Sequence, residues 1–128
     1  MELGDFTTNG TYSEVKEFND WLGTLDFKHK FLVAGKGDLV LDPSLRRGGI
    51  GKSDPRELIT NAQYLEDVGV DIEGFKIWGT PWAETMDRYG AFHINKEAVA
   101  RKKFGEIPEE TDLLLSYAPP FGKQSGRW

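Results

Sequence analysis

The sequence has no cysteine and only two histidines among its 128 residues. Without cysteine the chain forms no disulfide, and zinc sites or redox centres built on thiolates are excluded. No apolar run approaches the roughly 20 residues that a membrane-spanning helix needs. The N-terminal residues do not combine a basic segment with an apolar one, as a secretory signal does. These absences predict a soluble, cytoplasmic domain with no membrane partner.

Basic residues are in the minority: 16 Lys and Arg stand against 21 Asp and Glu, and the net charge is −5. This balance argues against nucleic acid as a partner, because phosphate backbones attract basic surfaces. Hydrophobic residues make up 38% of the chain and aromatic residues 12%, which favours a packed core over disorder. The length predicts a single domain over residues 1–128.

Three short apolar runs end in polar residues. The run 30–34 leads into Gly35-Lys36-Gly37-Asp38, the first residues lead into Gly4-Asp5, and 113–115 lead into Ser116-Tyr117. A buried strand that ends in such a turn is where α/β proteins usually place their chemistry, at the carboxyl edge of the sheet. The sequence therefore predicts an α/β fold with a candidate site where the three strand ends meet.

Local signals predict where the first helix begins and ends. Thr11 and Glu14 have the spacing of a capping box, in which each side chain binds the other residue's backbone N–H. The helix should end at Gly23. Four apolar side chains recur at helical spacing and should face the core: Val15, Phe18, Leu22 and Leu25. Asp54-Pro55 should begin a shorter helical segment, with Asp as the cap and Pro in the first position.

The second half of the chain contains the strongest strand signal. Residues 68–72 alternate as a strand does, and Glu73-Gly74 should turn the chain into a partner strand over 75–79. The segment 83–95 is aromatic-rich and is expected to be irregular. A helix is predicted over 96–104, with Ala98, Val99 and Ala100 inside. Its basic end, residues 101–103, should be solvated.

Several segments resemble one known family. Gly4-Asp5-Phe6-Thr7 is similar to the GD motif of calcineurin-like metallophosphoesterases. Residues 13–23, 58–65 and 74–82 resemble segments of that family's metallophosphoesterase-domain (MPPED) branch, and the resemblance runs from Gly4 to about Gly122. It implies a two-sheet β-sandwich flanked by helices. It also implies hydrolysis of a phosphodiester by two divalent ions, such as manganese, that activate a bridging water.

The metal motifs depart from the family pattern. Only Asp5 matches a family ligand, the carboxylate that bridges both metals. In Gly35-Lys36-Gly37-Asp38, which resembles the G-N-H-[ED] motif, Lys36 replaces an Asn ligand and Gly37 replaces the catalytic His. Tyr117, after Ser116, stands where another His ligand belongs. The D-x-H motif expected before Gly4 and the G-H-x-H motif expected after Trp128 are not in this sequence.

These departures lead to a fold and a function prediction. The fold should be α/β, a partial metallophosphoesterase-like sandwich that lacks the first and last strands of the family fold. The domain should be catalytically inactive and need no cofactor, and Lys36 could pair with Asp5 in place of a metal. The alternative is an active phosphodiesterase with manganese or another divalent metal pair. Unpaired sheet edges should cause self-association or low stability. The sequence identifies no other partner.

The remaining candidates favour structural interpretations. Gly51-Lys52-Ser53 ends like a phosphate-binding loop, but Arg46 stands where the pattern needs Gly, so phosphate or nucleotide binding is the weaker alternative to a mobile loop. His29 and His93 have no partner at metal-ligand spacing and should be surface or packing residues. Five aromatic residues are predicted to lie in the core: Trp21, Trp78, Trp82, Phe75 and Phe92.

Overall fold

A computed structural model of the chain describes residues 2–45, 53–84 and 90–118. Its elements are a mixture of helices and strands, which confirms the α/β class. The elements in chain order are β1 (Glu2–Leu3), α1 (Tyr12–Leu22), β2 (Phe31–Val33), the short 3₁₀ helices η1 (Leu39–Leu41) and η2 (Pro55–Leu58), β3 (Gln63–Tyr64), β4 (Val68–Ile72), β5 (Phe75–Thr80), β6 (Ala83–Glu84), β7 (His93–Ile94), α2 (Glu97–Gly105) and β8 (Leu113–Ser116).

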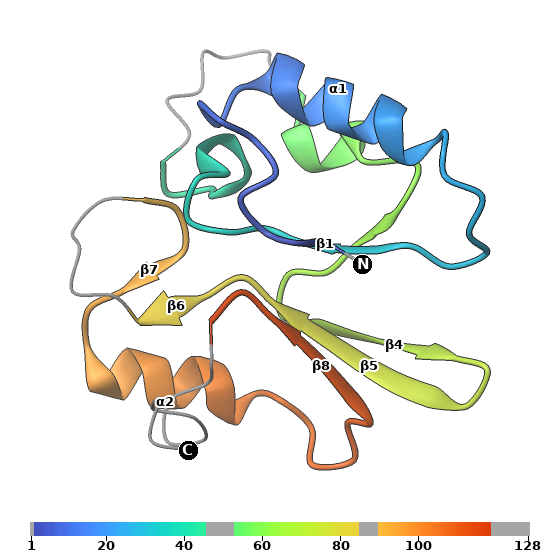
Figure 1. The fold of residues 1–128 in the computed structure, drawn as a ribbon. Coiled ribbons are helices and arrows are strands. Elements are labelled where there is room, and N and C mark those ends of the chain that lie inside the picture. The colour runs from blue at the N-terminus through green and yellow to red at the C-terminus, as the bar shows by residue number, and fades with distance from the viewer. Residues whose placement is uncertain (1, 46–52, 85–89, 119–128) are drawn as a thin grey trace.

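The first sheet is parallel and has the order β1-β2-β3, with Leu3 opposite Val33 and Leu32 opposite Tyr64. Parallel strands are buried on both faces, and Leu32 and Val33 are accordingly 1% and 0% exposed. Helix α1 lies over one face of this sheet, and the second sheet lies on the other side (Figure 1). Because β1 and β2 run the same way, Gly4-Asp5 and Gly35 leave the sheet at the same edge.

The second sheet has the order β4-β5-β8. Strands β4 and β5 form the predicted hairpin, and the turn residues Glu73 and Gly74 have φ angles of 53° and 88°. Two positive φ angles identify a type I′ turn, whose twist matches that of paired strands. Strand β8 pairs with β5 in parallel. Val33 of β2 packs with Ile77 of β5 and Leu115 of β8, so an apolar layer joins the two sheets.

Helix α1 forms as its local signals predict. The Thr11–Glu14 capping box is present and Gly23 is the C-cap. Val15 and Leu22 are buried, as expected for the inner face. The 3₁₀ helix η2 also begins as predicted, because the Asp54 carboxylate accepts a hydrogen bond from the backbone N–H of Arg56 at 3.0 Å.

Helix α2 differs from the prediction in the face that it buries. Ala100 is buried, but Ala98 and Val99 are exposed and Phe104 takes part in the core instead. Ala100 and Phe104 are four residues apart and therefore share the helix face that packs against Ile94. At the basic end, Arg101 and Lys102 are exposed as predicted. Lys103 is half-buried instead, and its ammonium lies 4.7 Å from the centre of the Trp82 ring.

The aromatic residues divide between core and surface. Phe92 is fully buried, and the Trp82 ring meets it edge-on at 5.5 Å. The core prediction is wrong for Trp21 and Phe75, which are 50% and 64% exposed. Phe75 is exposed because it flanks the hairpin turn, beyond the part of the second sheet that packs against Val33.

The segment 83–95, which was expected to be irregular, contains β6 and β7. These two strands pair in parallel through Ala83 and His93.

Neither α1 nor α2, nor any other described helix, has the length and apolar character needed to span a membrane.

Candidate functional site

The three predicted strand ends meet at the carboxylate of Asp5. The backbone N–H of Gly37 donates to Asp5 Oδ1 at 2.6 Å, and the Tyr117 hydroxyl donates to Asp5 Oδ2 at 2.7 Å. These residues follow β1, β2 and β8. Asp5 itself has a φ of 53°, in the left-handed region that a non-glycine residue seldom adopts. The sequence correctly predicted that these strand ends come together.

Two glycines make room for the Tyr117 ring. A Cβ atom at Gly4 would lie 2.7 Å from ring atom Cδ2 of Tyr117, and one at Gly35 would lie 2.8 Å from the same atom. Real Cβ atoms do not approach other atoms so closely, so a side chain at either position would displace the ring. The tyrosine therefore fits this edge of the sheets because both strands continue into glycine.

Burial and the contact with Asp5 both raise the pKa of Tyr117, to about 12, and a backbone hydrogen bond from Lys36 opposes the rise. Tyr117 is consequently a neutral hydrogen-bond donor at physiological pH. A phenol that keeps its proton is a weak metal ligand, since ligands bind metal ions in their deprotonated form.

Asp38 is a buried anchor for the same turn. Its side chain is 0% exposed and accepts hydrogen bonds from the Thr7 N–H at 3.0 Å, the Thr7 hydroxyl at 2.8 Å and the Gly35 N–H at 2.8 Å. The Asp5 backbone also donates to it. Burial raises the pKa of Asp38, and these hydrogen bonds oppose that effect. Asp38 thus ties the turn after β2 to the loop after β1.

The sequence did not single out Thr7, although it lies in the same motif as Asp5. Its backbone and hydroxyl supply two of the bonds to Asp38, and its hydroxyl also lies 3.2 Å from the Gly37 carbonyl. The one sequence feature that could have indicated this role is the position of the threonine directly after Gly-Asp-Phe. Its partner lies 31 residues away, so no local pattern could connect the two.

Lys36 lies at the rim of this cluster. Its aliphatic chain covers Gly90, where a Cβ atom would clash with Lys36 Cγ, and its backbone carbonyl accepts from the Ala91 N–H at 2.8 Å. Among the ion pairs between described residues, none joins Lys36 to Asp5. Asp5 is instead held by Gly37 and Tyr117.

The other described sequence candidates, Ser116 and Ser53, form hydrogen bonds with partners other than Asp5. The Ser116 hydroxyl donates to the carbonyl of Ala118. Gly51 and Lys52 lie outside the described residues, and the exposed Ser53 offers its carbonyl to the Tyr12 hydroxyl at 3.2 Å.

The two histidines lie on other elements of the fold. The His29 ring stacks with Phe31, with ring centres 6.4 Å apart, and His93 lies in β7. His29 lies 3.9 Å from the carboxylate of Glu73 as well.

The residues present do not fit the two-metal centre that the family resemblance implies. Such a centre needs several carboxylate, imidazole or amide ligands that converge. Here one carboxylate has both oxygens engaged in hydrogen bonds, Gly37 has no side chain, and Tyr117 keeps its proton. Within residues 2–45, 53–84 and 90–118, no group of three or more His, Asp or Glu side chains could hold a metal ion.

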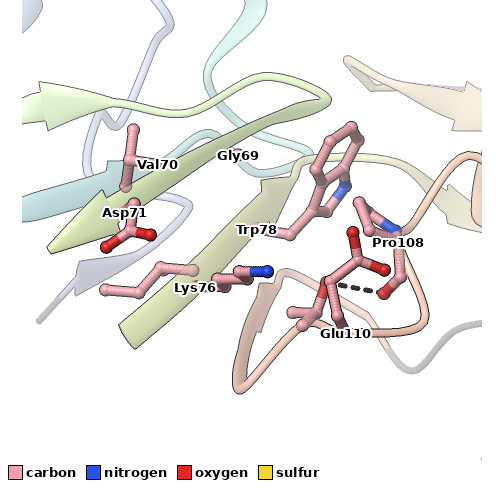
Figure 2. A pocket seen from close by; sticks show the side chains of 9 residues that line it. Gly69, Val70, Asp71, Lys76, Trp78, Pro108 and Glu110 are labelled. Carbon is pink, nitrogen blue, oxygen red and sulfur yellow. Dashed lines mark hydrogen bonds between the residues drawn. The ribbon is translucent and has the colours of Figure 1, made fainter. Parts of the chain in front are cut away.

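A groove of about 250 Å³ lies elsewhere, between the β4–β5 hairpin and the loop before β8 (Figure 2). Trp78 and the loop from Pro108 to Thr111 stand at one end, and Asp71 and Lys76 stand at the other. The Trp78 indole N–H is buried and has no hydrogen-bond partner among the described atoms. Trp78 was predicted to lie in the core, and no sequence pattern indicated this groove.

Comparisons with known proteins give the family context. No protein-family model matches the chain. Metallophosphoesterase domain-containing protein 1 of Homo sapiens is 34% identical over 95% of this chain and 42% of its own length. A UPF0046 protein of Caenorhabditis elegans is also 34% identical, over 95% of this chain and 46% of its own length. Probable rhamnogalacturonate lyase C of Emericella nidulans is 28% identical over 94% of this chain and 12% of its own length. The chain spans less than half the length of these relatives.

Proposed function

Because this chain is a relative of the metallophosphoesterase domain-containing proteins, we propose that it is a metallophosphoesterase-like segment that does not hydrolyse phosphate esters by itself. The predicted family resemblance is confirmed at 34% identity over 95% of the chain. The inactivity is our proposal, and it rests on the residues around Asp5.

The observation that carries the proposal is the state of the Asp5 carboxylate. Gly37 binds one of its oxygens and Tyr117 binds the other. In a two-metal phosphoesterase this carboxylate would instead bridge the two ions, and further ligands would complete their coordination. Gly37 and Tyr117 offer a backbone N–H and a protonated phenol at the positions where the family places imidazoles. Hydrogen-bond donors here take the place of metal ions.

We also propose that the two three-stranded sheets correspond to a partial version of the family's two-sheet sandwich. The apolar contacts of Val33 with Ile77 and Leu115 support this arrangement, because they join the sheets face to face. The lack of the first and last strands of the family fold remains part of this proposal.

The experiment compares the wild-type chain with Asp5→Asn. Each protein is assayed for manganese-dependent hydrolysis of bis(p-nitrophenyl) phosphate, and circular dichroism checks that the variant is folded. We expect both proteins to stay at the background rate. Asparagine keeps the shape of Asp5 and one acceptor oxygen, so the variant should still fold. Manganese-dependent hydrolysis by the wild type that is lost in Asp5→Asn would overturn the proposal and support the active phosphodiesterase.

A further inference from the structure

Strand β4 lies at an edge of the second sheet. Its sequence is Val-Gly-Val-Asp-Ile, and among the described strands only β5 pairs with it. Edge strands are usually protected by charged side chains, above all lysine, by proline or by a bulge that prevents pairing with another chain. Strand β4 has no lysine or proline, Asp71 is its one charged residue, and Val68 is 43% exposed. Within the described part of the chain, this edge is therefore weakly protected against another strand.

The hairpin turn determines which backbone groups point outwards. A two-residue type I′ turn closes on a hydrogen-bonded pair, here Ile72 and Phe75. Hydrogen-bonded and non-hydrogen-bonded pairs alternate along an antiparallel ladder, so Val70 and Val68 also direct their backbone groups towards β5. The N–H and C=O groups of Gly69 and Asp71 consequently point away from the sheet.

We propose that two copies of this chain associate through antiparallel pairing of their β4 strands, with Val70 on the twofold axis. In this register Gly69 of one copy faces Asp71 of the other, and each such pair exchanges two backbone hydrogen bonds. Symmetry produces a second pair. Every outward-pointing group of Gly69 and Asp71 then has a partner, and the two sheets become one continuous sheet.

The side chains favour this register over a shifted one. A register that puts Asp71 opposite Asp71 would bring two carboxylates together, which is unfavourable for directly opposed residues. In the proposed register each Asp71 faces a glycine, and its Oδ1 still accepts from the N–H of Gly74 in its own turn at 3.1 Å. On the opposite face, Val68 of one copy packs against Ile72 of the other, which removes exposed apolar surface from water.

The Asp71 face of β4 is also the side of the groove in Figure 2. Gly69 and Asp71 line this groove, and a Cβ atom at Gly69 would lie 3.2 Å from Trp78 Cε3. A second β4 strand would extend the groove wall across the twofold axis. The pairing does not involve Asp5, so this inference stands or falls independently of the proposed loss of hydrolysis.

A cysteine cross-link tests the register directly, because the natural chain has no cysteine. Val70→Cys would place two thiols in a non-hydrogen-bonded pair, where Cα atoms lie about 4.5 Å apart and a disulfide can form. Val68→Cys is the matched control, since position 68 faces Ile72 of the other copy. We expect Val70→Cys to give a covalent dimer on a non-reducing gel and Val68→Cys to stay largely uncross-linked. Equal cross-linking of both, or none for Val70→Cys, would contradict the register.

Light scattering over a concentration series tests the association itself. The mass of the wild type should rise from 14.4 kDa towards twice that value as concentration increases. Val68→Lys adds a charge at the edge and should hold the chain at the monomer mass. Val99→Lys is the control, because Val99 on α2 is also 43% exposed and lies on another element. A wild type that stays monomeric throughout, or two variants that behave alike, would overturn the proposal.

Discussion

Tyr117 connects the end of β8 to the loop after β1. It stands where the family resemblance implies an imidazole, and its phenol gives a hydrogen bond to Asp5 at 2.7 Å. The ring can occupy this position because Gly4 and Gly35 leave space for it. Asp5, Gly35 and Tyr117 therefore depend on one another, although they come from three different strands.

The raised pKa of Tyr117 makes a prediction about alkaline pH. The folded-state pKa of about 12 lies above the ordinary tyrosine pKa of 10.0, so this residue's contribution to stability is complete below about pH 10. It is lost as pH rises towards 12. A spectrophotometric titration of tyrosinate should show a group near pH 12 that Tyr117→Phe removes. Tyr64, whose pKa is also raised by burial and by Glu66, should still titrate late in that variant. Asp5→Asn should move the Tyr117 group to lower pH, and an unchanged titration in Asp5→Asn would contradict the role of Asp5.

Helix α1 is held in place by a polar side chain as well as by its apolar face. Asn19 is 6% exposed, and its Oδ1 accepts from the N–H groups of Thr60 and Asn61, both at 2.9 Å. Its Nδ2 donates to the Thr60 hydroxyl at 3.0 Å. These bonds connect the helix to the loop between η2 and β3, 41 residues away.

Asn19→Ala should therefore reduce the free energy of unfolding by about 1–3 kcal/mol, because it leaves two backbone N–H groups without an acceptor. The neighbouring exposed residue is the control, and Asp20→Ala should change stability by less than about 0.5 kcal/mol. Urea denaturation of the three proteins measures both values. Similar losses for the two variants would show that Asn19 acts through helix propensity alone.

The sequence correctly predicted those helices and strands whose signals lie close together in the chain. The capping box of α1 and the turn of the β4–β5 hairpin each depend on residues within one turn of the chain, and both are present. The buried face of α2 was predicted incorrectly, because Ala98 and Val99 are apolar but the contact with Ile94 selects the face of Ala100. Which face an element buries is decided by its tertiary neighbours.

The whole molecule is joined by the apolar layer between its two sheets. Leu115 of β8 is 2% exposed and packs with Val33 of β2, whereas Leu113 on the same strand is 41% exposed. Leu115→Ala should lower the free energy of unfolding by about 2–5 kcal/mol, because it leaves a cavity in this layer.

Leu113→Ala is the matched control and should cost much less, since water already reaches that side chain. Denaturant melts followed by tryptophan fluorescence and by circular dichroism should shift together in Leu115→Ala, because the layer joins the two sheets. Two separate unfolding transitions in Leu115→Ala, or equal losses of stability in both variants, would mean that this layer does not connect the two sheets.

The sequence predicted where the candidate site lies, but it did not predict the hydrogen bonds that hold the site together. Parallel strands direct their carboxyl ends to one edge, which accounts for Asp5 and Gly37 after β1 and β2. Tyr117 follows β8 of the second sheet and reaches Asp5 only because the two sheets pack together. The buried anchor formed by Asp38 and Thr7 was not predicted, because its partners lie 31 residues apart and follow from the packed fold. The exposure of Phe75 was missed for the same reason, since it depends on how far the first sheet extends.

The bond between Tyr117 and Asp5 joins residues that are 112 positions apart. Strand β8 must also find β5 in parallel, across the intervening β6, β7 and α2. Contacts of such long range form slowly, because the chain loses much loop entropy before they stabilise it. During synthesis the N-terminal sheet can therefore assemble early, but the Asp5 cluster stays open until the ribosome has released β8. A nascent chain stalled before residue 113 would present Asp5 without Tyr117, a transient state in which chaperones could encounter the uncovered edge.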